Sequence, residues 1–111
     1  MFLGRVRGHV VATAKDPAIK GRKLLVIEPL KVEYDQPAQA ANEREVTSGA
    51  RLEVTGRAIV ALDMIGAGEG QLVLVVQGSS ARMAQGCNQV PTDAVVIGIV
   101  DEAVVMGRRI V

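Results

Sequence analysis

Residues 2–12 read FLGRVRGHVVA, and two kinds of side chain alternate along this stretch. The even positions carry small or apolar side chains, whereas the odd positions carry mainly polar ones, from Arg5 to His9. A period of two is typical of a half-buried β-strand. Gly4 and Gly8 lie on the apolar side, so we expect either a close approach by another element or a sharp bend there. The segment predicts the first strand of a β-fold.

Further short strands are expected where apolar residues alternate, or run together, between turn-forming residues. These are Lys23 to Glu28, ended by Pro29; Leu52 to Val54 and Ala58 to Leu62, divided by a turn at Gly56; Leu72 to Gln77; Ala94 to Val100; and 108–111, the edge strand of a hairpin across Met106-Gly107.

One short helix is expected over residues 78–86, capped by Ser79 or Ser80 and ended by Gly86. Five or six short strands and a single short helix leave too little chain for two large sheets. The sequence therefore predicts an all-β fold, a small five- to six-stranded barrel that is closed or partly open.

The composition fits one domain over residues 1–111. Thirteen Lys and Arg balance twelve Asp and Glu, which argues against a general nucleic-acid binder. Nearly half of the residues are hydrophobic, yet only Phe2 and Tyr34 are aromatic. Because so small a domain leaves much of its surface exposed, this aliphatic content suggests burial between subunits.

Location and organisation follow from four further features. No apolar run approaches the length of a membrane span. Arg5 and Arg7 interrupt the N-terminal stretch where an export signal would need continuous apolar residues. A single cysteine, Cys87, fits a reducing compartment, so we expect a cytoplasmic protein. The pattern stops between Tyr34 and Gly49, which predicts a polar insertion at about 35–56 that is functional or flexible.

Candidate chemical motifs have simpler structural explanations. The glycines of GAGEG (residues 66–70) lack the spacing of a dinucleotide site and lead into a strand. The segment GSSAR (78–82) lacks the second glycine of a nucleophile elbow. His9 is expected to face solvent, Cys87 to be an inert thiol, and Asp63 and Asp93 to bond the backbone of turns. We expect no enzyme, no cofactor and no metal site.

Several blocks, taken in order, resemble the pentameric vertex proteins of bacterial microcompartment shells, the family of carboxysome and ethanolamine-utilisation vertex subunits. The blocks are LGRVRGHVVATAKDP (3–17), GRKLLV (21–26), ALDMIGAG (61–68), GSSAR (78–82), PTDA (91–94) and GIVD (98–101). The resemblance covers most of the chain except residues 35–56. Gln71 and Thr92 depart from it, since many relatives carry Glu and Val there.

The resemblance implies an oligonucleotide-binding-like barrel that assembles head-to-tail into a homopentamer. Such pentamers cap five-fold vertices, alongside hexameric and trimeric shell proteins, in the shell of a cytoplasmic microcompartment. It implies neither a nucleic-acid nor a membrane partner. It also implies a set of residues at subunit contacts or near the five-fold axis: Gly66, Gly68, Gly78, Ser79, Ser80 and Arg82. A barrel that binds single-stranded nucleic acid or a small ligand remains the alternative.

Overall fold

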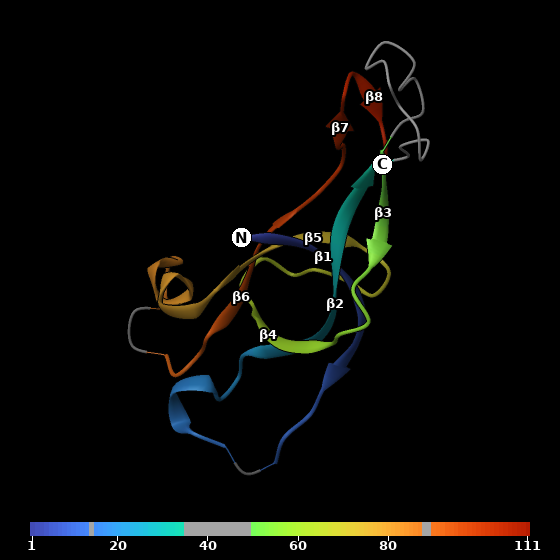
Figure 1. Ribbon diagram of the computed structural model, residues 1–111. Helices are drawn as coiled ribbons and strands as arrows, with labels where there is room; N and C mark the ends of the chain where they lie inside the picture. The colour runs from blue at the N-terminus through green and yellow to red at the C-terminus, as the bar shows by residue number, and fades with distance from the viewer. Residues whose placement is uncertain (14, 35–49, 88–89) are drawn as a thin grey trace.

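The computed structural model describes residues 1–13, 15–34, 50–87 and 90–111, and most of these residues form strands (Figure 1). The insertion predicted at about 35–56 falls mainly on residues that are not described. The elements are β1 (Phe2–Val10), η1 (Pro17–Ile19), β2 (Lys23–Tyr34), β3 (Ala50–Val54), β4 (Ile59–Asp63), β5 (Leu72–Gln77), η3 (Gly78–Met83), β6 (Ala94–Ile99), β7 (Val104–Val105) and β8 (Arg108–Arg109), where η denotes a 3₁₀ helix.

Five of these strands close into a barrel. The order is β1-β5-β6-β4-β2, and β2 pairs again with β1. All neighbours are antiparallel except β4 and β6, which are parallel. Closure gives every barrel strand two partners and so removes the unpaired edges of an open sheet. The predicted small all-β barrel is confirmed.

Strand β2 continues through Pro29, so the prediction that this proline ends the strand was wrong. Pairing with β4 stops at Ile27, and pairing with β3 starts at Leu30. Pro29 lies between the two partners, where the missing N–H costs no ladder bond on that side. Its carbonyl accepts the backbone N–H and the hydroxyl of Thr55, at 3.3 and 3.1 Å. The strand therefore runs on, and β2 and β3 form an arm beyond the barrel (Figure 1).

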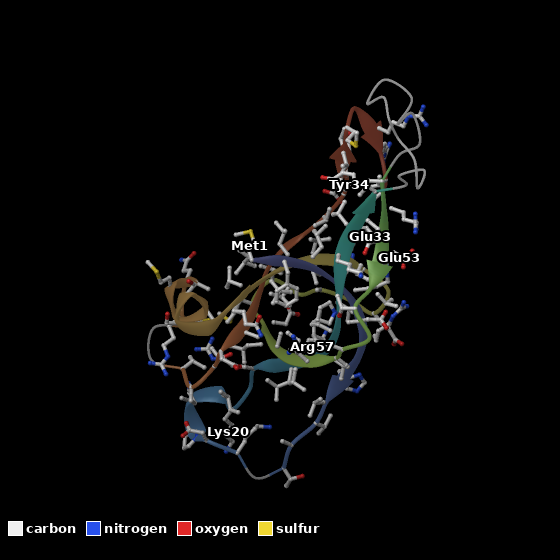
Figure 2. All side chains as sticks on the ribbon, in the orientation of Figure 1. Met1, Lys20, Glu33, Tyr34, Glu53 and Arg57 are labelled. Atoms are coloured by element: carbon white, nitrogen blue, oxygen red, sulfur yellow. The ribbon has the colours of Figure 1, made fainter. Side chains whose placement is uncertain are left out.

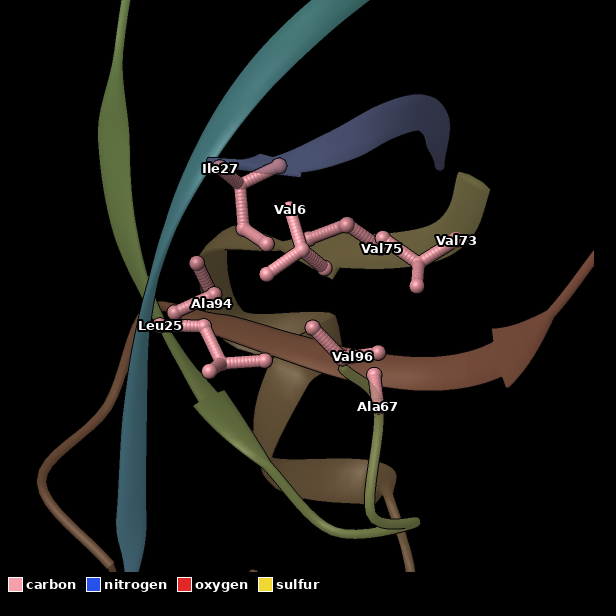
Figure 3. Packing of buried hydrophobic residues seen from close by; sticks show 9 residues of the cluster. Val6, Leu25, Ile27, Ala67, Val73, Val75, Ala94 and Val96 are labelled. Carbon is pink, nitrogen blue, oxygen red and sulfur yellow. The ribbon is translucent and has the colours of Figure 1, made fainter. Parts of the chain in front are cut away.

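The barrel interior is filled by aliphatic side chains that point toward one another from all five strands (Figure 3). The cluster comprises Val6, Leu25, Ile27, Ala61, Ala67, Val73, Val75, Ala94 and Val96. A Cβ atom on Gly4 would lie 2.4 Å from Cγ2 of Ile27, which confirms the predicted close approach at this glycine. Gly8 has open space around it and follows an irregularity in the β1–β2 register.

A second core covers the outer face of β4 and β6. Leu62 and Val95 point away from the interior and pack with Ala81, Cys87 and Val90. Since both faces of these strands are buried, their sequences are continuous apolar runs rather than alternating ones. Helices η1 and η3 lie on this side of the barrel (Figure 1).

The predicted helix differs in type, cap and length. It is a 3₁₀ helix that ends at Met83, not at Gly86, and its N-cap is Gln77, with no side-chain hydrogen bond. Ser79 and Ser80 lie within the helix, so neither of them caps it. Gly78 instead starts it with a φ of +72°, and its N–H donates to the carbonyl of Asp93 at 2.7 Å.

The predicted C-terminal hairpin is confirmed, with a shorter edge strand than expected. Met106 and Gly107 both have positive φ, as a tight two-residue hairpin turn requires. Only Arg108 and Arg109 form the second strand.

The β2–β3 arm carries alternating charges on one face. Lys31 lies opposite Glu53 and Glu33 opposite Arg51 in the register, and Glu33 and Glu53 project from neighbouring strands (Figure 2). The Lys31 ammonium and the Glu33 carboxylate form an ion pair at 2.7 Å. This hydrogen bond and the attraction between the charges raise the pKa of Lys31 and lower the pKa of Glu33. The two cations and two carboxylates on this face of the arm therefore balance one another.

Candidate functional site

The glycine-rich turn after β4 is held by a buried carboxylate. Asp63 is 7% exposed and accepts three backbone N–H groups: those of Ile65 at 3.1 Å, Gly66 at 3.2 Å and Ala67 at 2.9 Å. The predicted backbone-bonding role is confirmed for Asp63 but not for Asp93, whose side chain has no hydrogen bond within the described part of the chain. A carboxylate has enough acceptor positions to hold three donors at once, so this single side chain shapes the turn.

The rest of the turn is fixed against strand β1 and by its own Gln71. The amide oxygen of Gln71 accepts the N–H of Gly68 at 2.6 Å. Gly70 donates its N–H to the carbonyl of Val6 at 2.7 Å, and its own carbonyl accepts a hydrogen bond from Arg5 at 3.0 Å. Gly66 is exposed and has a φ of +84°, so it presents backbone without a side chain. These hydrogen bonds hold the turn against β1.

Helix η3 forms a second exposed patch. Gly78, Ser79, Ser80 and Arg82 are exposed, whereas Ala81 between them is buried in the second core. Within the described part of the chain, the side chains of Ser79, Ser80 and Arg82 have no hydrogen-bond partner or ion pair. Their polar groups therefore point outward with unused hydrogen-bonding capacity.

The six predicted residues do not form one cluster. Gly66 and Gly68 precede β5, and the other four follow its far end, so the length of the strand, about 17 Å, separates the two patches. The two segments meet instead at residues that the sequence does not mark as contacts: a Cβ on Gly86 would lie 3.3 Å from Cε of Met64. A hollow of about 650 Å³ lies there, lined by Met64, Ile65, Ala84, Gln85, Gly86 and Ile97.

Arg22 joins the sides of this hollow, a role that was not predicted from the sequence. Its guanidinium donates to the carbonyl of Ala18 at 3.3 Å, to the sulfur of Met64 at 3.2 Å and to the carbonyl of Gly86 at 3.2 Å. The next residue, Lys23, donates to the carbonyl of Ala67 at 2.9 Å. No signal in the sequence distinguishes these two cations from a solvated face, because their partners other than Ala18 lie 42 to 64 residues away along the chain.

Residues with reactive side chains are not assembled into a site. Cys87 is fully buried in the second core, and His9 is exposed on β1. Within the described ranges, no three His, Cys, Asp or Glu side chains lie close enough to hold a metal ion. Nor does any helix there have the length and apolar character needed to cross a bilayer.

Large apolar side chains are exposed near the hollow. Met83 is 86% exposed and Ile65 is 42% exposed. An apolar surface with polar, unpaired groups at its margin is typical of a contact between proteins. The arrangement thus suits association with a protein surface better than catalysis.

Comparisons with known proteins agree with this view. The family described as "Ethanolamine utilisation protein EutN/carboxysome" matches residues 1–101. The carboxysome shell vertex protein CcmL of Synechococcus elongatus is 38% identical over 110 residues, which cover 99% of this chain and 93% of that protein. The microcompartment shell vertex protein EutN of Salmonella typhimurium is 37% identical over 108 residues, covering 97% and 91%.

Solved structures show the same fold. CcmL of Gloeobacter violaceus matches with a TM-score of 0.75 and 36% identity, covering 98% of this chain and 94% of that one. GrpN, a pentameric microcompartment shell protein from Rhodospirillum rubrum, matches with a TM-score of 0.67 and 35% identity, covering 96% and 100%. The resemblance predicted from the sequence motifs is confirmed, and with it a structural role and a location in the shell of a cytoplasmic microcompartment. The chain belongs to the EutN/CcmL family of bacterial microcompartment shell vertex proteins.

Proposed function

We propose that five copies of this chain form a closed ring that caps a five-fold vertex of a microcompartment shell, and that the chain has no catalytic activity. Membership of the vertex family is the observation that carries this proposal. The ring lies among hexameric and trimeric shell proteins. Six-fold tiles alone make flat sheets, and five-fold units supply the curvature that closes the shell.

A cyclic ring needs two different, complementary patches on each subunit, because the contact is head-to-tail. The glycine-rich turn and helix η3 lie at opposite ends of β5 and so provide two separate surfaces. We assign Gly66 and Gly68 to one patch, and Gly78, Ser79, Ser80 and Arg82 to the other, as subunit contacts. Gly66 and Gly78 are exposed and have no side chain, so a neighbouring backbone can approach them closely.

Arg82 is the sharpest test within this set. Its planar guanidinium can hold backbone carbonyls or a carboxylate in a fixed geometry, and it has no described partner within its own subunit. In the ring it donates to a neighbouring subunit. Its exposure also means that replacing it leaves the barrel core intact.

Native mass spectrometry tests the ring directly. Five copies of 11.7 kDa give about 58.5 kDa for a closed five-fold assembly. A dominant species at that mass is expected, and a monomer or dimer at every concentration refutes the proposal.

The Arg82→Ala variant tests the proposed contact. We expect it to dissociate at protein concentrations at which the original chain remains a ring. Lys20→Ala is the matched control, because Lys20 is an exposed cation on the helix η1 side (Figure 2) and has no described side-chain partner. Equal dissociation of the two variants refutes the assigned role of Arg82.

A further inference from the structure

Two turns that are far apart in the sequence form the sides of the hollow over Ile97. One turn, at Met64 and Ile65, follows β4, and the other, at residues 84–86, follows η3. Neither turn belongs to a helix or a strand, so the shape of the hollow depends on what joins them. A Cβ on Gly86 would lie 3.3 Å from Cε of Met64, and besides this close approach Arg22 supplies hydrogen bonds to both turns.

Arg22 reaches three segments with one rigid group. Its Nε donates to Ala18 in helix η1, its Nη1 to the sulfur of Met64 and its Nη2 to the carbonyl of Gly86. A guanidinium presents its donors in a fixed planar fork, so the positions of these three acceptors are fixed relative to one another. A lysine ammonium is a single point on a flexible stem and cannot reproduce the three directions.

The neighbouring Lys23 holds the far end of the same glycine-rich turn through the carbonyl of Ala67. Arg22 and Lys23 therefore bind the turn at Met64 and at Ala67, which lie before and after Gly66. Asp63 shapes the turn from within, whereas Arg22 ties it to the segment after η3.

We propose that Arg22 is a positioning residue for subunit association, which fixes the two turns relative to each other before the neighbouring subunits bind. The proposal rests on the proposed ring. A surface that is ordered in advance loses less conformational entropy on binding, so it binds more tightly without any new contact. Arg22 acts through Met64 and Gly86 and need not touch the neighbour.

Arg22→Lys is the test variant, since it keeps the charge and removes the fork, and Lys20→Ala is the control. Amide hydrogen exchange, measured by NMR, reports how firmly the segment after η3 is held. The informative amides are those of Ala84 and Cys87, which donate to the carbonyls of Ala81 and Ala84. We expect about tenfold faster exchange at these amides in Arg22→Lys, because a single ammonium cannot keep the hydrogen bonds to both Met64 and Gly86. Amides of the barrel core, such as Leu25 and Val75, keep their rates, as do all amides in the control.

Dissociation of the ring on dilution is the second readout. We expect the Arg22→Lys ring to dissociate at about fivefold higher protein concentration, by loss of preorganisation. Unchanged exchange rates at Ala84 and Cys87 refute the proposal that Arg22 holds the two turns in place. Faster exchange with unchanged dissociation overturns its role in association.

A general loss of stability is distinguished by the core amides, since uniformly faster exchange across the barrel also overturns the proposal. If the original chain forms no ring, the proposed function fails, whereas the exchange experiment still reports whether Arg22 joins the turns. The failures of the two proposals are thus separable.

Discussion

The approach of Gly4 to Ile27 gives a quantitative prediction for the barrel. A Cβ at position 4 would lie 2.4 Å from Cγ2 of Ile27, whereas ordinary carbon contacts are about 3.5–4.0 Å. Gly4→Ala therefore requires a shift of about 1 Å in a fully buried side chain of the interior cluster. Overpacking of this kind costs about 1–3 kcal/mol, and the absence of exposed surface at Ile27 places the cost at about 2–3 kcal/mol.

Gly8→Ala is the matched control on the same strand. A Cβ atom on Gly8 would meet no described atom within 4 Å, and the φ of this residue is not positive. We expect no loss of stability, or a gain of about 0.5 kcal/mol from the lower entropy of the unfolded chain. Urea unfolding at one fixed protein concentration measures both variants, because association makes apparent stability depend on concentration.

The contact itself can be tested by removing the atom that clashes. Ile27→Leu eliminates Cγ2 at nearly constant volume and on its own costs less than about 1.5 kcal/mol. In the Gly4→Ala background it should recover about 1 kcal/mol relative to the sum of the single effects. If Gly4→Ala is as stable as Gly8→Ala, or if the two changes are strictly additive, the steric argument is refuted.

Three further predictions concern single residues. Asp63→Ala should lower the free energy of unfolding by about 2–3 kcal/mol, because three backbone N–H groups lose a charged acceptor; a loss below about 0.5 kcal/mol, the range of ordinary surface substitutions, contradicts it. The Cys87 thiol should react with a thiol reagent only after unfolding, since it is fully buried; fast reaction of the folded protein contradicts this. The Lys31–Glu33 pair should stabilise the folded state at pH values between the ordinary pKa of a carboxyl group and the ordinary pKa of a lysine. This stabilisation should be lost as pH falls through the lowered pKa of Glu33, and also as pH rises through the raised pKa of Lys31. Glu33→Gln should therefore weaken the dependence of the melting temperature on pH in the acid range.

The sequence predicts well those features that depend on neighbours in the chain. Strand β5 has the predicted bounds, and the hairpin predicted across Met106-Gly107 is present. The path through Pro29 was missed because it depends on two different strands, β4 and β3, pairing with the same edge of β2 on either side of that residue. A local pattern contains no information about which strands will meet there.

The same limit explains the candidate site. The glycines of the turn are visible in the sequence because each bears a local conformational demand. The role of Arg22 is not visible, since its acceptors on Met64 and Gly86 are brought close only when the barrel has closed and the chain after η3 has folded back over Leu62 and Val95. Motifs therefore identified the turns, and only the fold reveals what joins them.

The fold also bears on the alternative of a barrel that binds single-stranded nucleic acid. That function uses aromatic rings as stacking platforms along a cationic groove. Phe2 instead packs against the interior cluster of the barrel, and Tyr34 lies at the end of the β2–β3 arm, away from the barrel wall (Figure 2). On the arm and on β1, Lys31 and Arg7 are engaged by Glu33 and Glu28, at 2.7 and 3.0 Å. Phe2, Arg7 and Lys31 are thus engaged within the subunit, so they do not form a row of stacking platforms along a cationic groove.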